Sequence, residues 1–198
     1  AGIYEELADA PNGSANAGST AVTENVATNR KLIKTVELDV ETENFADMID
    51  RVEDRTNTLG GYISDSYVYN GSKYTGGKVY RTADITIRIP ESKLDLFVEE
   101  IGDFSNVVEK TVNTEDVTLQ YVDTEGKKAM YRAEEESLLA LLENAEDLED
   151  ITYLTSRLAE VRYMIESMES TLRTYDNLVD YATIHLSVEE VETLTEII

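Results

Sequence analysis

The sequence predicts an α+β fold, because two kinds of hydrophobic periodicity follow one another along the chain. Strands are expected at residues 32–40, 62–69, 79–89, 107–112 and 182–188, and helices at residues 45–59 and 94–101. In the first, third and fifth of the strand segments, hydrophobic residues alternate with polar ones, which is typical of half-buried strands. A chain of 198 residues with 41% hydrophobic residues is also large enough to bury a core.

The order of these elements predicts a layered sandwich. Asn44 is a suitable N-cap for the first helix, and Gly60-Gly61 ends it. The second helix is expected to begin after Pro90 and to end at Gly102. The resulting order is that of a ferredoxin-like βαββαβ sandwich, in which a four-stranded antiparallel sheet carries two helices on one face.

A long helical hairpin is predicted after the sandwich. Hydrophobic residues alternate three and four positions apart at Ile151, Leu154, Leu158, Val161, Ile165, Met168, Leu172 and Tyr175. Such a heptad seam needs a partner helix, and residues 120–145 are the nearest candidate. We therefore expect an antiparallel coiled-coil hairpin, inserted before the fifth strand. Helices of about 25 residues reach roughly 38 Å, so the hairpin should protrude from the sandwich.

The two arms of this hairpin do not match completely. Lys128 and Glu135 are polar at positions where the seam of the first arm should be hydrophobic. This mismatch leaves hydrophobic surface on the second arm, and we expect Val161 and Met168 to contact a partner there. Weak self-association through the hairpin follows, opposed at low salt by the negative charge of the chain.

Composition divides the chain into four parts. Residues 1–29 form a polar linker that cannot bury enough surface to fold. Residues 30–115 and 180–190 form the α+β sandwich, and residues 116–179 form the inserted hairpin. Residues 191–198 are expected to be a juxtamembrane segment. No stretch has the length and hydrophobicity of a membrane span or a signal peptide, and we expect the chain to have been trimmed.

The charge of the chain limits its partners. Lys and Arg number 17 against 41 Asp and Glu, which gives a net charge of −24. Nucleic acids would be repelled, so we expect no nucleic-acid binding. The chain has no cysteine, which rules out disulfides, thiolate metal sites and cysteine nucleophiles.

Candidate chemistry is sparse. The single histidine, His185, is expected on the strand face opposite the hydrophobic one, without the further ligands of a metal site or the partners of a catalytic triad. Asp116, Asp123 and Glu125 form a carboxylate cluster of a kind that can bind Ca²⁺ through oxygen ligands. We favour a structural role for them, because carboxylates at a helix start also complement the helix dipole. We predict no catalytic residue, no cofactor and no metal, and therefore a protein that is not an enzyme.

Tyrosines gather around the loop between the second and third strands. They are Tyr62, Tyr67, Tyr69, Tyr74 and Tyr80. An aromatic surface can stack on sugars or contact a protein, although tyrosine is also an ordinary strand residue. Tyr67, Tyr69, Tyr74 and Tyr80 are the candidate ligand or partner contacts.

Five short motifs occur in one order along the chain. They are Arg30-Lys31-Leu32-Ile33-Lys34, Leu59-Gly60-Gly61-Tyr62-Ile63, Ile87-Arg88-Ile89-Pro90, Glu115-Asp116-Val117-Thr118 with Tyr121-Val122-Asp123, and Val179-Asp180-Tyr181-Ala182-Thr183-Ile184. Together they resemble a family of bacterial envelope proteins, domain-of-unknown-function family 4349, over about residues 30–188. The strong acidity and the tyrosine-rich second strand depart from the family's common pattern.

The resemblance implies an extracytoplasmic location and a membrane anchor. Members of the family usually have an N-terminal signal or lipoprotein signal, a polar linker, this domain and often a C-terminal transmembrane helix. No catalytic residues are carried over. We expect a non-catalytic interaction or sensor domain whose hairpin contacts other envelope proteins or a second copy. The alternative is a module that binds a glycan or another surface polymer through the tyrosine-rich hairpin.

Overall fold

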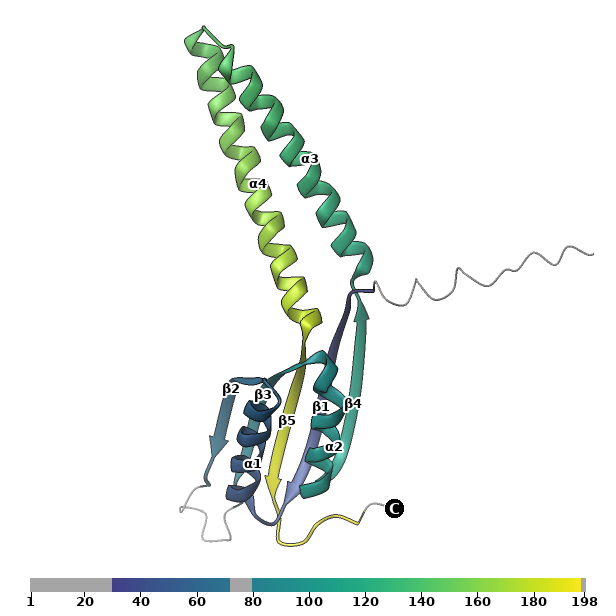
Figure 1. Cartoon of the computed structure of the whole chain (residues 1–198). Coiled ribbons are helices and arrows are strands. Elements are labelled where there is room, and N and C mark those ends of the chain that lie inside the picture. The colour runs from purple at the N-terminus through teal and green to yellow at the C-terminus, as the bar shows by residue number, and fades with distance from the viewer. Residues whose placement is uncertain (1–29, 72–79, 197–198) are drawn as a thin grey trace, which may run out of the picture. The chain divides into compact units, whose positions relative to one another are not determined.

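The computed structural model describes residues 30–71 and 80–196 of the chain (Figure 1). The chain divides into two units, Ala1–Arg30 and Lys31–Ile198. Every described helix and strand belongs to the second unit, which is a mixed α+β structure. The expected linker at residues 1–29 lies outside the described residues, as does Tyr74.

The elements follow the predicted order. The strands are β1 (Leu32–Thr42), β2 (Tyr62–Tyr69), β3 (Thr82–Pro90), β4 (Asn106–Asp116) and β5 (Tyr181–Glu190). The helices are α1 (Phe45–Thr58), α2 (Leu94–Phe104), α3 (Thr118–Glu143) and α4 (Leu148–Asp180), with a short 3₁₀ turn, η2 (Glu91–Lys93), before α2. None of the helices in the described residues is long and hydrophobic enough to cross a membrane.

Among the boundaries that differ from the predictions, two have a clear physical reason. The helix α2 continues past Gly102 to Phe104, because Gly102 does not adopt the positive φ that would end the helix there. The strand β4 continues past Val112 to Asp116, because its backbone pairs with β1 along its whole length. Backbone pairing of this kind needs no hydrophobic alternation, so the pattern underestimated the strand.

The sheet has five strands in the order β2-β3-β5-β1-β4. The strand β5 lies between β3 and β1, antiparallel to the first and parallel to the second. The expected four-stranded antiparallel sheet is therefore wrong, and the ferredoxin-like order is not confirmed. The central place of β5 has a physical reason, because four of its side chains are hydrophobic and are shielded from water by the neighbouring strands and helices. Ala182, Ile184, Leu186 and Val188 are all buried.

The core lies between the sheet and two helices. Figure 1 shows α1 and α2 covering the same face of the sheet. Val36, Leu38 and Val40 of β1 belong to one buried cluster with Phe97 and Ile101 of α2. Each such side chain contributes about 1.5–3 kcal/mol when it is fully buried. Because side chains alternate along a strand, the opposite face of the sheet receives the polar residues.

Asn44 caps the start of α1 as predicted, since its side-chain oxygen accepts a hydrogen bond from the Asp47 amide at 3.5 Å.

The turn after α1 depends on two glycines for different reasons. Gly60 has a φ of 78°, which strains other residues. Gly61 lies so close to β3 that an added Cβ would be 2.5 Å from the Arg88 carbonyl oxygen.

The helices α3 and α4 form an antiparallel hairpin with its own small core. Leu138 of α3 packs with Leu158, Val161 and Ile165 of α4, flanked by Tyr131. The predicted seam is thus the inner face of the hairpin. Coiled-coil geometry is not confirmed.

The expected free surface on the seam is not present at Val161. Its side chain is 1% exposed, while Met168 is half-buried. The prediction failed because Glu135 does not leave a gap between the helices. Its half-buried carboxylate instead lies between Arg132 and Arg162, at 3.3 Å and 2.8 Å.

Candidate functional site

The hairpin is attached to the sheet through Arg88 of β3. The neighbouring Ile87 and Ile89 are buried in the core, so the Arg88 side chain lies on the face away from α1 and α2. Its guanidinium donates to Thr183 Oγ1 at 2.5 Å, and to the backbone oxygen and Oδ1 of Asn177 at 3.0 Å each. Arg88 is only 8% exposed, and its Nε has no partner.

Asn177 belongs to the last turn of α4. The carbonyl of Asn177 also accepts from the Tyr181 amide, and carbonyl groups at a helix C-terminus carry partial negative charge. A guanidinium in contact with them is therefore favourable, even without a carboxylate. Because Thr183 belongs to β5, the Arg88 side chain holds two strands and the end of α4 together.

A second cluster joins the start of β1 to both hairpin helices. Lys31 Nζ lies 2.8 Å from Asp176 Oδ1 and 4.2 Å from the centre of the Tyr121 ring. The Tyr121 hydroxyl donates to Asp176 Oδ2 at 3.3 Å. The backbone of Lys31 also accepts from the Val117 amide and donates to Thr118 Oγ1, both at 2.9 Å. This Lys31 cluster therefore fixes the first turn of α3 beside the last turn of α4.

The charges in the Lys31 cluster support one another. The hydrogen bond from Lys31 lowers the pKa of Asp176 below its usual value, and the same bond raises the pKa of Lys31. Burial raises the pKa of Tyr121, and the hydrogen bond to Asp176 adds to the effect. At neutral pH, Lys31 is therefore a cation, Asp176 an anion and Tyr121 a neutral phenol. These are the charge states that the contacts within the cluster stabilise.

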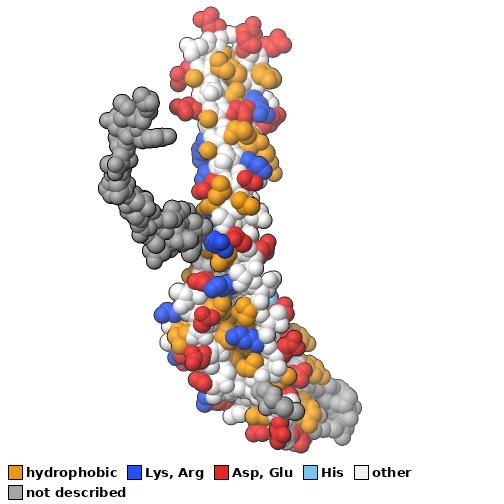
Figure 2. Space-filling view, turned by 90° about the vertical axis from the view of Figure 1, so that its right-hand side faces the viewer, with side chains coloured by type: hydrophobic (Ala, Val, Ile, Leu, Met, Phe, Trp, Pro, Cys, Tyr) orange, Lys and Arg blue, Asp and Glu red, His pale blue; other side chains and the backbone are white. Residues whose placement is uncertain are grey.

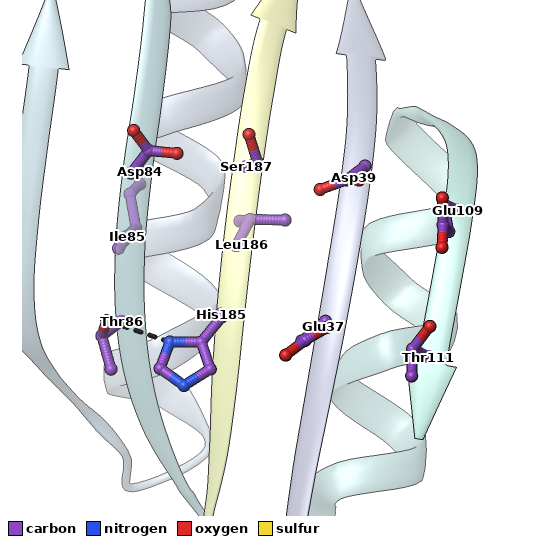
Figure 3. A pocket seen from close by; sticks show the side chains of 10 residues that line it. All are labelled: Glu37, Asp39, Asp84, Ile85, Thr86, Glu109, Thr111, His185, Leu186 and Ser187. Carbon is purple, nitrogen blue, oxygen red and sulfur yellow. Dashed lines mark hydrogen bonds between the residues drawn. The ribbon is translucent and has the colours of Figure 1, made fainter. Parts of the chain in front are cut away.

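The uncovered face of the sheet is a shallow polar concavity of about 330 Å³ (Figure 3). Two rows of side chains cross it on neighbouring strands. One row contains Asp84, Ser187, Asp39 and Glu109, and the other contains Thr86, His185, Glu37 and Thr111. The face is therefore acidic, and it can attract cations or basic groups but repels anions.

His185 lies on this face, opposite the hydrophobic one, as predicted. Its Nδ1 is 3.3 Å from Thr86 Oγ1 (Figure 3), and the ring is exposed. Within residues 30–71 and 80–196, no three histidine, aspartate or glutamate side chains are arranged to hold a metal ion. The candidate carboxylate Asp116 instead accepts hydrogen bonds from the amide and hydroxyl of Thr118, at the start of α3.

The predicted tyrosines lie at one margin of the same face. Tyr67 pairs with Asp84 and Tyr69 with Thr82 across the β2–β3 ladder, so both share the face with the carboxylates. Tyr67 is 60% exposed, and Tyr69 and Tyr80 are exposed as well. Tyr74 lies outside the described residues. The structure thus brings Tyr67 and Tyr69 together beside the acidic concavity.

Ion pairs cross between the hairpin helices. Arg132 of α3 contacts Glu169 of α4 at 2.8 Å, and Glu134 contacts Arg157 at 2.7 Å. The hydrogen bond from Arg162 lowers the pKa of Glu135. Arg132, Arg157 and Arg162, half of the six basic residues of the hairpin, are thus paired with carboxylates. The more numerous acidic residues give the hairpin its negative charge.

The arrangement of sandwich and hairpin can be compared with known proteins. The family model described as "Domain of unknown function (DUF4349)" matches residues 30–197. The chain belongs to this family. The match spans both the sandwich and the hairpin. Searches of curated proteins and of solved structures found no match.

Sequence reasoning did not find the residues that attach the hairpin of this DUF4349 domain. Arg88 is an ordinary polar position in an alternating strand, and nothing in the sequence shows which helix end covers it. Lys31 and Asp176 are 145 residues apart, so no local pattern connects them. The sole signal was that Arg88 and Lys31 belong to motifs of the family resemblance.

Replacing Arg88 tests the attachment to the helix end. We expect Arg88→Ala to lower the free energy of unfolding by about 1.5–3 kcal/mol, because hydrogen bonds to a charged group are lost at a buried site. Arg173→Ala, at an exposed position of α4, should change it by about 0.5 kcal/mol or less. Urea denaturation measures both, and equal effects would contradict the assigned role.

The Lys31 cluster predicts a specific pH dependence. A carboxyl whose pKa is lowered by folding stabilises the folded state above its unfolded pKa, and this stabilisation is lost as the pH falls through the folded pKa. Asp176→Asn should therefore be less stable than the wild type at pH 7, by roughly 0.5–1 kcal/mol for this half-exposed pair. The difference should vanish as the pH drops below 3.8, the ordinary value for Asp. A difference that is constant from pH 7 to pH 2.5 would exclude the ion pair as its cause.

Proposed function

We propose that this protein is a non-catalytic interaction or sensor domain, tethered to a bacterial membrane on its extracytoplasmic side. Its hairpin contacts other envelope proteins, and its sandwich is the platform that holds the hairpin. In this proposal the hairpin is a short antiparallel coiled coil. The platform is a ferredoxin-like sandwich opened between β1 and β3 to admit β5.

The observation that carries this proposal is the fastening of the hairpin to the middle of the sheet. The helix α4 continues without a loop into β5, the central strand. Arg88 and the Lys31 cluster hold the same end of the hairpin from the side. A force or a partner acting on the hairpin would therefore act on β5. Fixed attachment of this kind suits a contact arm better than a flexible spacer.

The proposed location rests on the family resemblance to membrane-anchored envelope proteins. The path of β5 is compatible with it, because this strand starts at the hairpin and ends at Glu190, at the other end of the sheet. An anchor that followed the C-terminal segment would be connected to the end of the sheet remote from the hairpin. The hairpin would then be free to reach a partner.

Cysteine chemistry tests the contact and the location together, because residues 1–198 contain no cysteine. Tyr163 is 70% exposed on α4, and Tyr163→Cys in the full-length protein can be treated in intact cells with a membrane-impermeant maleimide–amine cross-linker. We expect labelling and one discrete cross-linked product. Lys110→Cys, on the exposed strand β4, should be labelled without giving that product.

The possible outcomes separate the two parts of the proposal. Absence of labelling at both positions would contradict the extracytoplasmic location. Labelling without a cross-linked product at Tyr163→Cys, or the same product from both positions, would contradict a contact through the hairpin.

A second candidate function is a module for glycans or other surface polymers. The specific observation in its favour is that Tyr67 and Tyr69 are exposed on one face beside Asp84 and other carboxylates. Aromatic rings that stack on sugars, next to acidic groups that accept hydrogen bonds from hydroxyls, are a common form of carbohydrate site. The acidic face also favours a neutral or basic polymer over an anionic one.

Titration with neutral and amino-sugar oligosaccharides tests this second function. We expect Tyr67→Ala with Tyr69→Ala to weaken binding at least tenfold, because stacking on both rings is lost. Leu119→Ala, an exposed change on the hairpin, is the matched control and should leave binding unchanged. No binding by the wild type, or equal binding by all variants, would exclude the tyrosine face as the site.

A further inference from the structure

The outer face of α3 is unusually poor in charge. Leu119, Gly126, Ala133 and Ala140 recur at every seventh residue, and because seven residues make almost two helical turns they lie on one face. The face that contacts α4 contains Tyr131 and Leu138 and lies on the opposite side of the helix. A solvent-facing stripe of this kind normally carries charged and polar residues.

Large hydrophobic side chains line the same stripe. Leu119, Val122, Met130 and Leu141 are all more than half exposed. Figure 2 shows hydrophobic side chains following one another along the hairpin, with acidic side chains gathered at its tip. No described element covers this α3 stripe, and its length matches that of the whole helix.

The α3 stripe is complementary to itself. It is nearly symmetric about the step from Ala129 to Met130: Gly126 and Ala133 lie at equal distances on either side of this centre, and Leu119 lies as far from it as Ala140. In an antiparallel pair of α3 helices, the large Leu119 would therefore face a small alanine. The small residues near the centre allow two helix backbones to approach closely.

The charges beside the stripe obey the same symmetry. Lys127 and Glu134 lie on one flank, and Glu125 and Arg132 lie on the other. Antiparallel helices bring matching flanks together, so both pairs would place opposite charges across the interface. Within one chain Glu134 already contacts Arg157, and Arg132 contacts Glu169. In the pair these carboxylates and guanidinium groups would be shared between two partners.

We propose that the α3 stripe binds the α3 stripe of a second copy of this chain, with the two helices antiparallel. The proposal deepens the proposed function, because it names one partner and the surface that this partner uses. It also replaces Val161 as the self-association contact, since that side chain is buried between α3 and α4.

Electrostatics favours the antiparallel direction over the parallel one. The hairpin tip contains five carboxylates and no basic residue, at Glu143, Glu146, Asp147, Glu149 and Asp150. A parallel pair would place two such tips side by side, whereas an antiparallel pair keeps them at opposite ends. Because the whole chain has a charge of −24, long-range repulsion opposes any pairing, and we expect a weak dimer that strengthens as salt screens this repulsion.

Disulfide trapping of the full chain tests the geometry directly. We expect oxidised Met130→Cys to form a covalent dimer, because residue 130 lies next to the two-fold axis. Leu119→Cys alone should not, because its two copies would be about 31 Å apart at 1.5 Å per residue. A mixture of Leu119→Cys and Ala140→Cys should give the mixed dimer. Thr174→Cys, exposed on α4, is the control for random collision.

The outcomes decide between the arrangements. Trapping of Met130→Cys no faster than Thr174→Cys would overturn the proposal, and trapping of Leu119→Cys with itself would overturn the antiparallel direction.

Light scattering after size exclusion gives a second, independent readout. Ala133→Glu should shift the chain to a monomer at concentrations where the wild type shows dimer, while Thr174→Glu adds the same charge without this effect. Helical content by circular dichroism confirms that both variants are folded. An unchanged dimer in Ala133→Glu would overturn the proposal. If the chain does not self-associate but the cross-linked product from Tyr163→Cys persists in cells, the proposed function stands without this partner. If neither self-association nor the cross-linked product is found, both the proposed function and this inference are contradicted.

Discussion

The contact between the Arg88 guanidinium and the C-terminal end of α4 is the constraint on which the other features depend. It places a buried cation where a helix ends and where β5 begins, so that one side chain donates to the Asn177 carbonyl in the last turn of α4 and ties two strands to the hairpin. Without it, α4 would be held to the sheet by its covalent connection to β5 and by the Lys31 cluster. The Lys31 cluster also fastens the end of α4, with a half-exposed ion pair in place of a buried cation.

The sequence predicted the layers of this fold better than their connections. Alternation at Ala182, Ile184 and Leu186 identified β5 correctly, but alternation reports which face of a strand is buried and not which strands lie beside it. The heptad seam identified the hairpin interior, yet it could not show that Glu135 would be paired and that Val161 would be covered. Arg88 has no local signature, because its partner lies 89 residues away.

The candidate surfaces were predicted in part. The tyrosines of β2 stood out by number, and the structure places Tyr67 and Tyr69 on one face beside carboxylates that come from three other strands. That juxtaposition arises from sheet order, which the sequence alone did not reveal. The charge-poor outer face of α3 was visible in principle, as Leu119, Gly126 and Ala133 at seven-residue spacing. It becomes informative once the opposite face is known to be occupied by α4.

The central claim is that hairpin and sheet behave as one cooperative unit because of the Arg88 junction. Native-state hydrogen exchange tests it most directly, since it measures the opening free energy of each amide. The account predicts that amides in the last turns of α4 open with the same free energy as those in the central strands β1 and β5. It would be contradicted if the α4 amides opened at a free energy several kcal/mol lower while the sheet remained protected.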